Sequence, residues 1–325
     1  MTALLATRMA EADAAAAADA ARALAAGGLV AFPTETVYGL GADATNGPAI
    51  ARLYAAKGRP VFNPLIAHVA DVPAAQRLAC FDANAARLAK NFWPGPLTLV
   101  LPKAAECPVA DLATAGLDTI AIRVPSHTVA REILAAFGKP VVAPSANRSG
   151  HVSSTCAEHV EADLGGRIDL IVDGGPTPVG VESTIVACLG EPLLLRPGGL
   201  PRAAIERALA RALADPPARG GKNAIAPGML VTHYAPRTRL RLNAHRITPG
   251  EAVLAFGSAP AEGAAHAKCV FNLSARGDLV EAAANLFAHL RALDAAGADA
   301  IAAMPVPRDG LGEAINDRLA RAAAR

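Results

Sequence analysis

The sequence predicts an α/β protein of two domains, and three observations lead to this fold class. Short apolar runs with β-branched residues alternate with helical patterns along most of the chain, which is typical of α/β layers. Residues 215–226 are rich in Pro and Gly and lack periodicity, which indicates a linker. The 325 residues suffice for two domains of roughly 100–200 residues each. We therefore expect a first domain at 1–213, a linker at 214–236 and a small second domain at 237–325.

The elements of the first domain follow from two kinds of pattern. An Ala-rich stretch at 12–26 has high helix propensity and ends at Gly27-Gly28, a common helix stop. Apolar residues at helical spacing predict further helices at 49–56, 84–91, 128–137, 157–164 and 202–213. Buried-strand patterns occur at 29–32, 65–69, 97–101, 119–124, 141–143, 170–172, 184–188 and 192–195. Their interleaving predicts a sheet covered by helices.

The second domain has the same kind of alternation on a smaller scale. Its patterns predict strands at 252–256, 269–273 and 300–303 and helices at 278–296 and 313–324. Just before them, arginines alternate with other residues over 237–242. This segment fits an edge strand whose charges prevent pairing with another chain, or a contact with RNA, and the edge strand is the better explanation.

Composition excludes several classes of protein. The chain is 52% hydrophobic and 18% charged, so it is not intrinsically disordered, and no run approaches the roughly 20 apolar residues of a membrane span. Acidic residues interrupt the N-terminal Ala run, which argues against a signal peptide. Five scattered cysteines without a C-x-x-C pair indicate a reduced, cytoplasmic protein. The net charge of +2 is far from that of a dedicated nucleic-acid binder.

Three short polar segments flank the ends of predicted strands, at 34–36, 145–147 and 182–184. Sheets of this class bind ligands at such ends, so one cleft would collect the hydroxyl, amide and carboxylate groups of these segments. Each segment also fits an ordinary turn, because Ser, Thr, Asn and Gly are common turn residues. We interpret 33–39 as a polar loop. The G-x-G-x-x-A pattern at 39–44 lacks the strand and helix that a dinucleotide site requires, and we do not expect one.

Three basic residues are candidates for an anion site. Lys57 and Arg59 follow a predicted helix and suit phosphate oxygens, but they also suit the negative end of the helix dipole. Arg123 ends an apolar strand, where it binds either an anionic ligand or a structural carboxylate. His68 by itself fits a core histidine. No His, Cys and Asp cluster has metal-site spacing, and no hydrolase triad is indicated.

The order of seven motifs and a linker motif resembles the YrdC-type threonylcarbamoyl-AMP synthase family, in the longer form with an additional C-terminal domain. The motifs are FPTETVYGLG, KGRPVFNPLI, WPGPLTLVL, TIAIRVPSH, VVAPSANRSG, VESTIV and LLLRPG, followed by HYAP. Phe62 departs from the pattern, since relatives often carry a polar residue there. The resemblance implies a twisted mixed-sheet YrdC-like domain with an open cleft and a smaller Rossmann-like α/β domain.

The resemblance also implies an activity. L-threonine and bicarbonate would form a carbamate that attacks the α-phosphate of ATP, releasing pyrophosphate and L-threonylcarbamoyladenylate. A partner enzyme would then transfer the threonylcarbamoyl group to adenosine next to the tRNA anticodon, with direct tRNA binding by this chain weak or absent. Mg²⁺ would enter with ATP, without an assigned protein ligand, and no tightly bound cofactor is expected.

The implied site residues fall into two groups. Lys57 and Arg59 would stabilise charge, with no covalent nucleophile. The residues implied around L-threonine are Thr36, His68, Arg123 and Ser183. Those implied around ATP are Lys57, Arg59, Asn63, Thr119, Ser145, Asn147, Ser153, Arg196 and Tyr234. Tyr234 lies in the linker and would close over the nucleotide, or it would pack between the two domains.

Two other function classes remain open at this point. A non-enzymatic RNA-binding protein would use the same type of fold, but the small net charge argues against it. A carbamoyl-transfer protein of hydrogenase maturation carries a related domain, but this chain lacks the Cys-rich zinc segments that accompany it. The role of the second domain stays open, because it contains no recognisable chemical motif.

Overall fold

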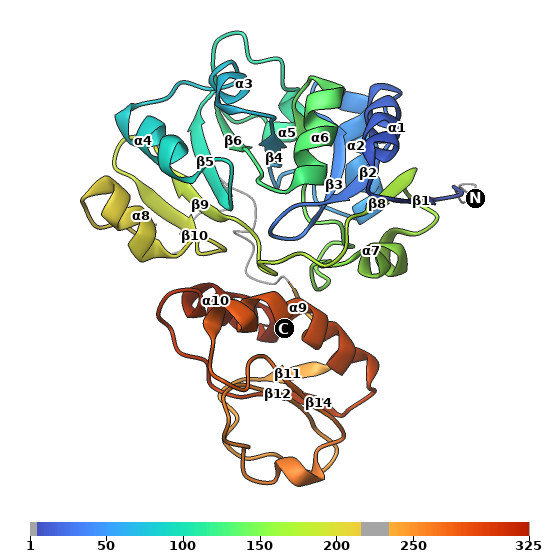
Figure 1. Cartoon of the computed structure of the whole chain (residues 1–325), viewed down its shortest axis with the longest axis vertical. Coiled ribbons are helices and arrows are strands. Elements are labelled where there is room, and N and C mark those ends of the chain that lie inside the picture. The colour runs from blue at the N-terminus through green and yellow to red at the C-terminus, as the bar shows by residue number, and fades with distance from the viewer. Residues whose placement is uncertain (1–4, 216–233, 325) are drawn as a thin grey trace.

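The computed structural model describes residues 5–215 and 234–324. Figure 1 shows two domains, with the strands of the second domain lying on the far side of α9 and α10 from the first domain. Most of the predicted linker, including His233, lies outside the described residues.

The first domain contains one mixed sheet of ten strands in the order β1-β8-β2-β3-β7-β4-β6-β5-β9-β10. The sheet contains both parallel pairs, such as β4 with β6, and antiparallel pairs, such as β4 with β7. The strands are β1 Arg8–Glu11, β2 Val30–Pro33, β3 Tyr38–Asp43, β4 Ile66–His68, β5 Leu97–Pro102, β6 Thr119–Arg123, β7 Val141–Val142, β8 Leu170–Asp173, β9 Thr184–Ala187 and β10 Leu193–Arg196. The expectation of a mixed α/β sheet is confirmed.

Helices of the first domain begin where the sequence supplies caps. The side chains of Asp13, Asn46 and Asp82 accept hydrogen bonds from the first turns of α1, α2 and α4. The helices are α1 Ala14–Ala25, α2 Gly47–Lys57, α3 Val72–Gln76, α4 Ala83–Phe92, α5 Asp111–Thr114, α6 Thr128–Phe137, α7 Ala157–Leu164 and α8 Arg202–Leu209. The predicted helix at 202–213 is too long, because Ala210 takes the left-handed conformation that ends α8.

The segment predicted as a polar loop at 33–39 is only partly one. Residues from Tyr38 onward form the buried strand β3, which pairs antiparallel with β2. The glycines of β3 explain why this strand was not predicted from the sequence. A Cβ at Gly41 would lie 2.7 Å from the Phe32 ring, so the close packing of β3 on β2 requires glycine, a residue type that strand patterns rarely include. Strand β1, at the sheet edge, was likewise not predicted.

The sheet has a different environment on its two faces near the centre. Strand residues alternate in direction, so Ile66 and His68 of β4 share one face with Arg123 of β6. The intervening Ala67 and Ile122 instead belong to the main core, which includes Leu88 of α4 and Ile205 of α8. The face that carries His68 and Arg123 therefore points away from the helices of that core.

The second domain contains a parallel four-stranded sheet in the order β11-β14-β12-β13. Its strands are β11 Arg239–Arg241, β12 Ala252–Ala255, β13 Val270–Asn272 and β14 Ala300–Ala303, and its helices are α9 Leu279–Ala295 and α10 Gly312–Ala323. The predicted edge position of the arginine-rich segment is confirmed by β11. Apolar residues of α9 and α10 pack in one cluster with Val37, Val152 and Val181 of the first domain, so the two domains share buried surface.

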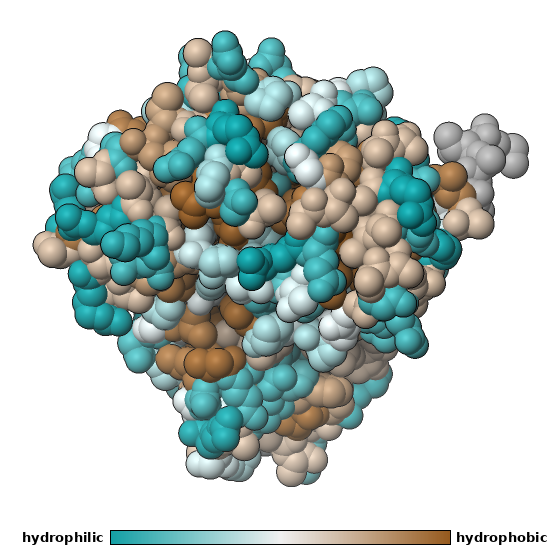
Figure 2. Space-filling model, turned by 45° about the horizontal axis from the view of Figure 1, so that its top comes forward, coloured by the Kyte–Doolittle hydropathy of each residue, from teal (hydrophilic) through white to brown (hydrophobic). Residues whose placement is uncertain are grey.

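In the part of the chain that the structure describes, no helix combines the length and apolar character needed to cross a bilayer. On the face shown in Figure 2, hydrophilic and hydrophobic residues are interspersed.

Candidate functional site

A central cavity lies on the open face of the first sheet and collects residues from distant parts of the chain. Contributions come from the loop before β3, the segment after α2, strands β4 and β6, the loop after β7, the segment around β9 and β10, and the end of the predicted linker. The cavity is lined by Thr36, Val37, Arg59, Leu65, Ile66, His68, Arg123, Ala143, Pro144, Ser145, Glu182, Ser183, Arg196 and Tyr234. Most residues that the family resemblance implied are among them.

Arg123 and Glu35 form the ion pair that dominates the predicted threonine side. Arg123 Nη2 lies 2.8 Å from Glu35 Oε1, and both side chains are buried. Arg123 Nε also donates to the Gly95 carbonyl, while Glu35 accepts from the Ser126 N–H. Burial raises the pKa of Glu35, but the charge and hydrogen bond of Arg123 outweigh it and lower the pKa below its ordinary value. The two sequence interpretations of Arg123 are therefore compatible, because it pairs with a carboxylate while lining the cavity.

The hydroxyl groups on this side are held by one another. Thr36 Oγ1 lies 2.8 Å from Thr34 Oγ1, and Ser183 Oγ lies 2.7 Å from Thr98 Oγ1. His68 Nδ1 contacts the Ile66 carbonyl at 3.1 Å, so this nitrogen carries the proton and Nε2 is an acceptor. The side thus offers one guanidinium, oriented hydroxyls and a neutral imidazole, which suit the carboxylate and polar groups of an amino acid.

The buried His68 imidazole should make the protein lose stability at acidic pH. Burial, reinforced by the charge of Arg123, lowers the pKa of His68 to about 3. The unfolded chain, with an ordinary pKa near 6.5, therefore binds a proton at pH values where the folded chain does not. This contribution is fully present above about pH 6.5 and is lost as the pH falls toward 3. Urea unfolding of wild type and His68→Asn between pH 7 and 4.5 checks this. The variant should lose less stability, and equal losses would contradict the assignment.

The predicted phosphate side contains two arginines. Arg59 Nη2 donates to the Pro64 carbonyl at 3.1 Å, and its buried Nε has no hydrogen-bond partner among the described residues. Arg196 donates to the Ser183 carbonyl through Nε and Nη2, at 3.2 and 2.8 Å. An unsatisfied buried donor is costly, so Arg59 Nε suits an oxygen supplied by a ligand.

Lys57 lies behind the cavity instead of lining it. Its buried amine donates to the carbonyls of Ser145, at 2.5 Å, and Asn147. Burial, together with the charge of Arg59, lowers the pKa of Lys57 well below its ordinary value. In this structure Lys57 therefore holds the loop that presents Ser145, and its predicted contact with ATP stays a prediction.

The other implied ATP residues take different positions. Asn147 and Asn63 are buried, and each has a side-chain oxygen without a hydrogen-bond partner among the described residues. Ser153 is also buried and donates to Glu182 Oε1 at 2.5 Å. Thr119 begins β6, about 13 Å along the strand from Arg123, and does not line the cavity.

Among the described residues, Glu182 is the one carboxylate in the wall of a cavity that also carries three arginines. Burial raises its pKa, but the charges of Arg318 and Arg196, with the hydrogen bonds of Ser153 and Arg318, lower the pKa to about 2. The sequence placed Glu35 and Glu182 in polar segments expected to share a cleft, but neither residue was assigned a role at the threonine or ATP site. Their position inside the motifs PTETVY and VEST was the available signal, but their arginine partners lie far away in the chain.

Tyr234 lies in the cavity wall and at the domain junction, and its closing over a nucleotide stays a prediction. It lines the cavity and is 1% exposed. Its ring stacks on Phe287 of α9, with centroids 5.5 Å apart, and the Arg318 guanidinium lies 5.2 Å from its centroid. Tyr234 therefore forms both a wall of the cavity and a part of the domain junction.

Comparison with known protein families and relatives covers nearly the whole chain. The family model named for Sua5, YciO and YrdC, described as telomere recombination, matches residues 22–198. A second model, described as threonylcarbamoyl-AMP synthase, C-terminal domain, matches residues 200–324. The threonylcarbamoyl-AMP synthase of Pyrococcus abyssi is 44% identical over 316 residues, which are 91% of this chain and 90% of the relative. That of Bacillus subtilis is 43% identical over 313 residues, covering 91% and 89%.

Solved structures agree with this relationship. The crystal structure of P. abyssi Sua5 complexed with L-threonine has a TM-score of 0.90 at 39% identity and covers 98% of both chains. Full-length HypF, solved with phosphate and nucleotide, has a TM-score of 0.52 at 20% identity and covers 57% of this chain and 29% of its own. The second likeness concerns the fold alone.

Proposed function

The chain belongs to the threonylcarbamoyl-AMP synthase family in its two-domain form, and we infer that its central cavity makes L-threonylcarbamoyladenylate from L-threonine, bicarbonate and ATP. The observation that carries this inference is the convergence of Arg59, Arg123 and Arg196 with oriented hydroxyl groups in one cavity. Phosphoryl and nucleotidyl transfer depend mainly on positioning and charge stabilisation, so such a cavity needs no covalent nucleophile.

The reaction joins two steps. The threonine amine and bicarbonate form a carbamate with loss of water. A carbamate oxygen then attacks the α-phosphorus of ATP, and the bond to the β-phosphate oxygen breaks as pyrophosphate leaves. Arg123 binds the threonine carboxylate, while Arg59 and Arg196 bind the phosphates and stabilise the charge that develops on them.

Magnesium would enter this site with ATP. Among the described residues, no group of three or more His, Cys, Asp or Glu side chains is arranged to hold a metal ion. Glu182 is already bound to Ser153 and Arg318. Phosphate oxygens and water therefore suit Mg²⁺ better than protein ligands do.

The product would serve the modification of tRNA next to the anticodon. A mixed anhydride of this kind requires a second enzyme that transfers the threonylcarbamoyl group to adenosine, and we propose such an enzyme as the partner. A cytoplasmic location completes the proposal and agrees with five free cysteines.

Pyrophosphate release tests the proposed function. The full reaction should release pyrophosphate from ATP, and the release should fall when threonine or bicarbonate is omitted in turn. Salt-dependent retention of tRNA without pyrophosphate release would instead favour an RNA-binding protein. The fold likeness to HypF at 20% identity gives no support for carbamoyl transfer in hydrogenase maturation.

Replacing Tyr234 by alanine should distinguish a role in ATP binding from a role in the domain junction. Tyr234 lines the cavity, and removing an aromatic contact to a base typically costs about 1–3 kcal/mol, so the KM for ATP should rise on the order of 10-fold. Loss of the stack on Phe287 should also lower the melting temperature. Phe287→Ala is the matched control, because it breaks the same stack from the other side. Equal KM values for ATP in the two variants would show that Tyr234 serves only the domain junction.

A further inference from the structure

Arg318 of the second domain reaches the wall of the central cavity. It lies on α10, its side chain has no exposed surface, and its Nε donates to Glu182 Oε2 at 2.8 Å. Its guanidinium also faces the Tyr234 ring. One residue of α10 thus contacts two residues that line the cavity, although no part of α10 lines the cavity itself.

The contact continues to Ser153, which the family resemblance places at ATP. Glu182 accepts the Ser153 hydroxyl through Oε1, at 2.5 Å, while Oε2 accepts from Arg318. A carboxylate that is held at both oxygens has a fixed orientation, and it fixes the hydroxyl that it binds. Arg318 therefore controls where the Ser153 side chain lies.

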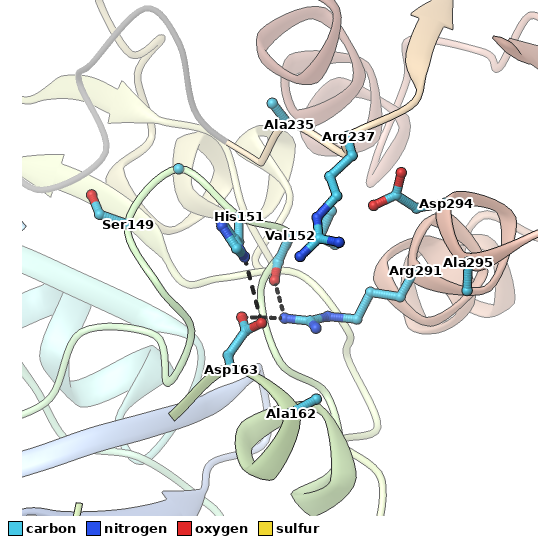
Figure 3. A pocket seen from close by; sticks show the side chains of 11 residues that line it. Ser149, His151, Val152, Ala162, Asp163, Ala235, Arg237, Arg291, Asp294 and Ala295 are labelled. Atoms are coloured by element: carbon cyan, nitrogen blue, oxygen red, sulfur yellow. Dashed lines mark hydrogen bonds and ion pairs between the residues drawn. The ribbon is translucent and has the colours of Figure 1, made fainter. Parts of the chain in front are cut away.

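A second arginine of the same domain holds the main chain around Ser153. Arg291 of α9 donates to the carbonyls of Val152 and Ser153 and pairs with Asp163 at 2.9 Å. Figure 3 shows Arg291 extending across the junction to Val152 and Asp163, beside a second cavity. The side chain and the main chain of Ser153 are thus both positioned from the second domain.

Charge gives Arg318 a second effect. Arg318 and Arg196 both interact electrostatically with Glu182. If Arg318 were absent, Glu182 would lose its ion pair and remain as a buried charge whose electrostatic interaction with Arg196 persists. Its attraction would then hold Arg196 away from an anionic ligand, and its negative charge would repel phosphate.

We propose that Arg318 is a positioning residue for ATP, which neutralises Glu182 and orients it to hold Ser153. This inference rests on the proposed function and gives the second domain a defined part in it. Another ion pair across the junction, Arg202 with Glu313, lies at partly exposed side chains outside the wall of the central cavity. A pair that only joined the domains would not need to be buried against the cavity.

The test uses the full chain and compares Arg318→Met, Arg318→Lys, Arg318→Met with Glu182→Gln, and the control Arg202→Met. Pyrophosphate release gives the KM for ATP, and calorimetry gives the affinities for threonine and for ATP. Arg318→Met should weaken ATP binding about 10-fold or more and leave threonine affinity within about 2-fold. Adding Glu182→Gln should recover most of the ATP affinity, because the uncompensated charge is removed. Arg202→Met should leave the KM for ATP unchanged.

Several outcomes would overturn the proposal. Equal losses of threonine and ATP affinity, or a lower melting temperature with unchanged ATP binding, would indicate a purely structural pair. If Arg318→Met does not fold, Arg318→Lys provides the test, because lysine keeps the charge but loses the planar fork. Normal ATP affinity in a folded Lys variant that has lost the Glu182 contact would contradict the positioning role. A wild-type chain that binds ATP without releasing pyrophosphate contradicts the proposed function alone, since calorimetry still tests Arg318.

Discussion

Replacing Arg59 by alanine should lower the rate of threonylcarbamoyl-AMP formation about 10²–10³-fold, the usual effect of losing one preorganised donor to developing charge. The Nε of Arg59 is buried without a partner among the described residues, and Nη2 donates to the main-chain carbonyls of Asn63 and Pro64. Loss of the Arg59 side chain should therefore lower the melting temperature only slightly. Initial rates of pyrophosphate release, together with melting curves, measure both effects.

Two other variants show whether the loss of rate is specific to Arg59. Arg131→Ala removes an exposed arginine of α6 and should leave rate and melting temperature near wild type. Lys57→Ala removes the amine that binds the carbonyls of Ser145 and Asn147, so it should lower the melting temperature as well as the rate. If Arg59→Ala keeps the wild-type rate, Arg59 does not bind the reacting phosphates.

The positions of the polar segments at strand ends could be predicted from the sequence because they depend on local pattern. Apolar β-branched runs mark strands, and the polar residues that follow them lie at the sheet edge, where ligands bind. This reasoning located Thr36, Ser145 and Ser183, which the structure places in one cavity. The pairing of His68 with Arg123 in register on adjacent strands needed the three-dimensional structure, since no local pattern specifies which strands are neighbours.

The missed parts depend on long-range contacts. Strand β3 contains glycines that allow it to pack closely against β2 and β7. Considered without these contacts, glycine is typical of a loop. Glu35 and Glu182 are buried because Arg123 and Arg318, distant in the chain, compensate their charges. In the second domain, the pattern identified α10 correctly but gave no sign that Arg318 points into the junction instead of into solvent.

Replacing Arg123 by alanine should weaken threonine binding by about 2–5 kcal/mol, because the substrate carboxylate and Glu35 would both lose their cation. Arg123→Lys keeps the charge but loses the planar fork that can bind two carboxylates at once, so it should fall between alanine and wild type. Calorimetric titration of L-threonine into the full chain measures the affinity. Serine, which lacks one methyl group, should bind wild type only about 10–200-fold more weakly.

Glu35 provides the control that separates two causes of this loss. In Arg123→Ala the buried Glu35 carboxylate would stay near the threonine carboxylate and repel it, so part of the lost affinity reflects repulsion and not the missing contact. Adding Glu35→Gln removes the repulsion and should recover part of the affinity, and the remaining deficit measures the contact of Arg123 with threonine. Full recovery in the double variant would show that Arg123 acts only by neutralising Glu35. Equal threonine affinity in wild type and Arg123→Ala would exclude Arg123 from the threonine site, because a desolvated guanidinium that binds a carboxylate cannot be removed without loss.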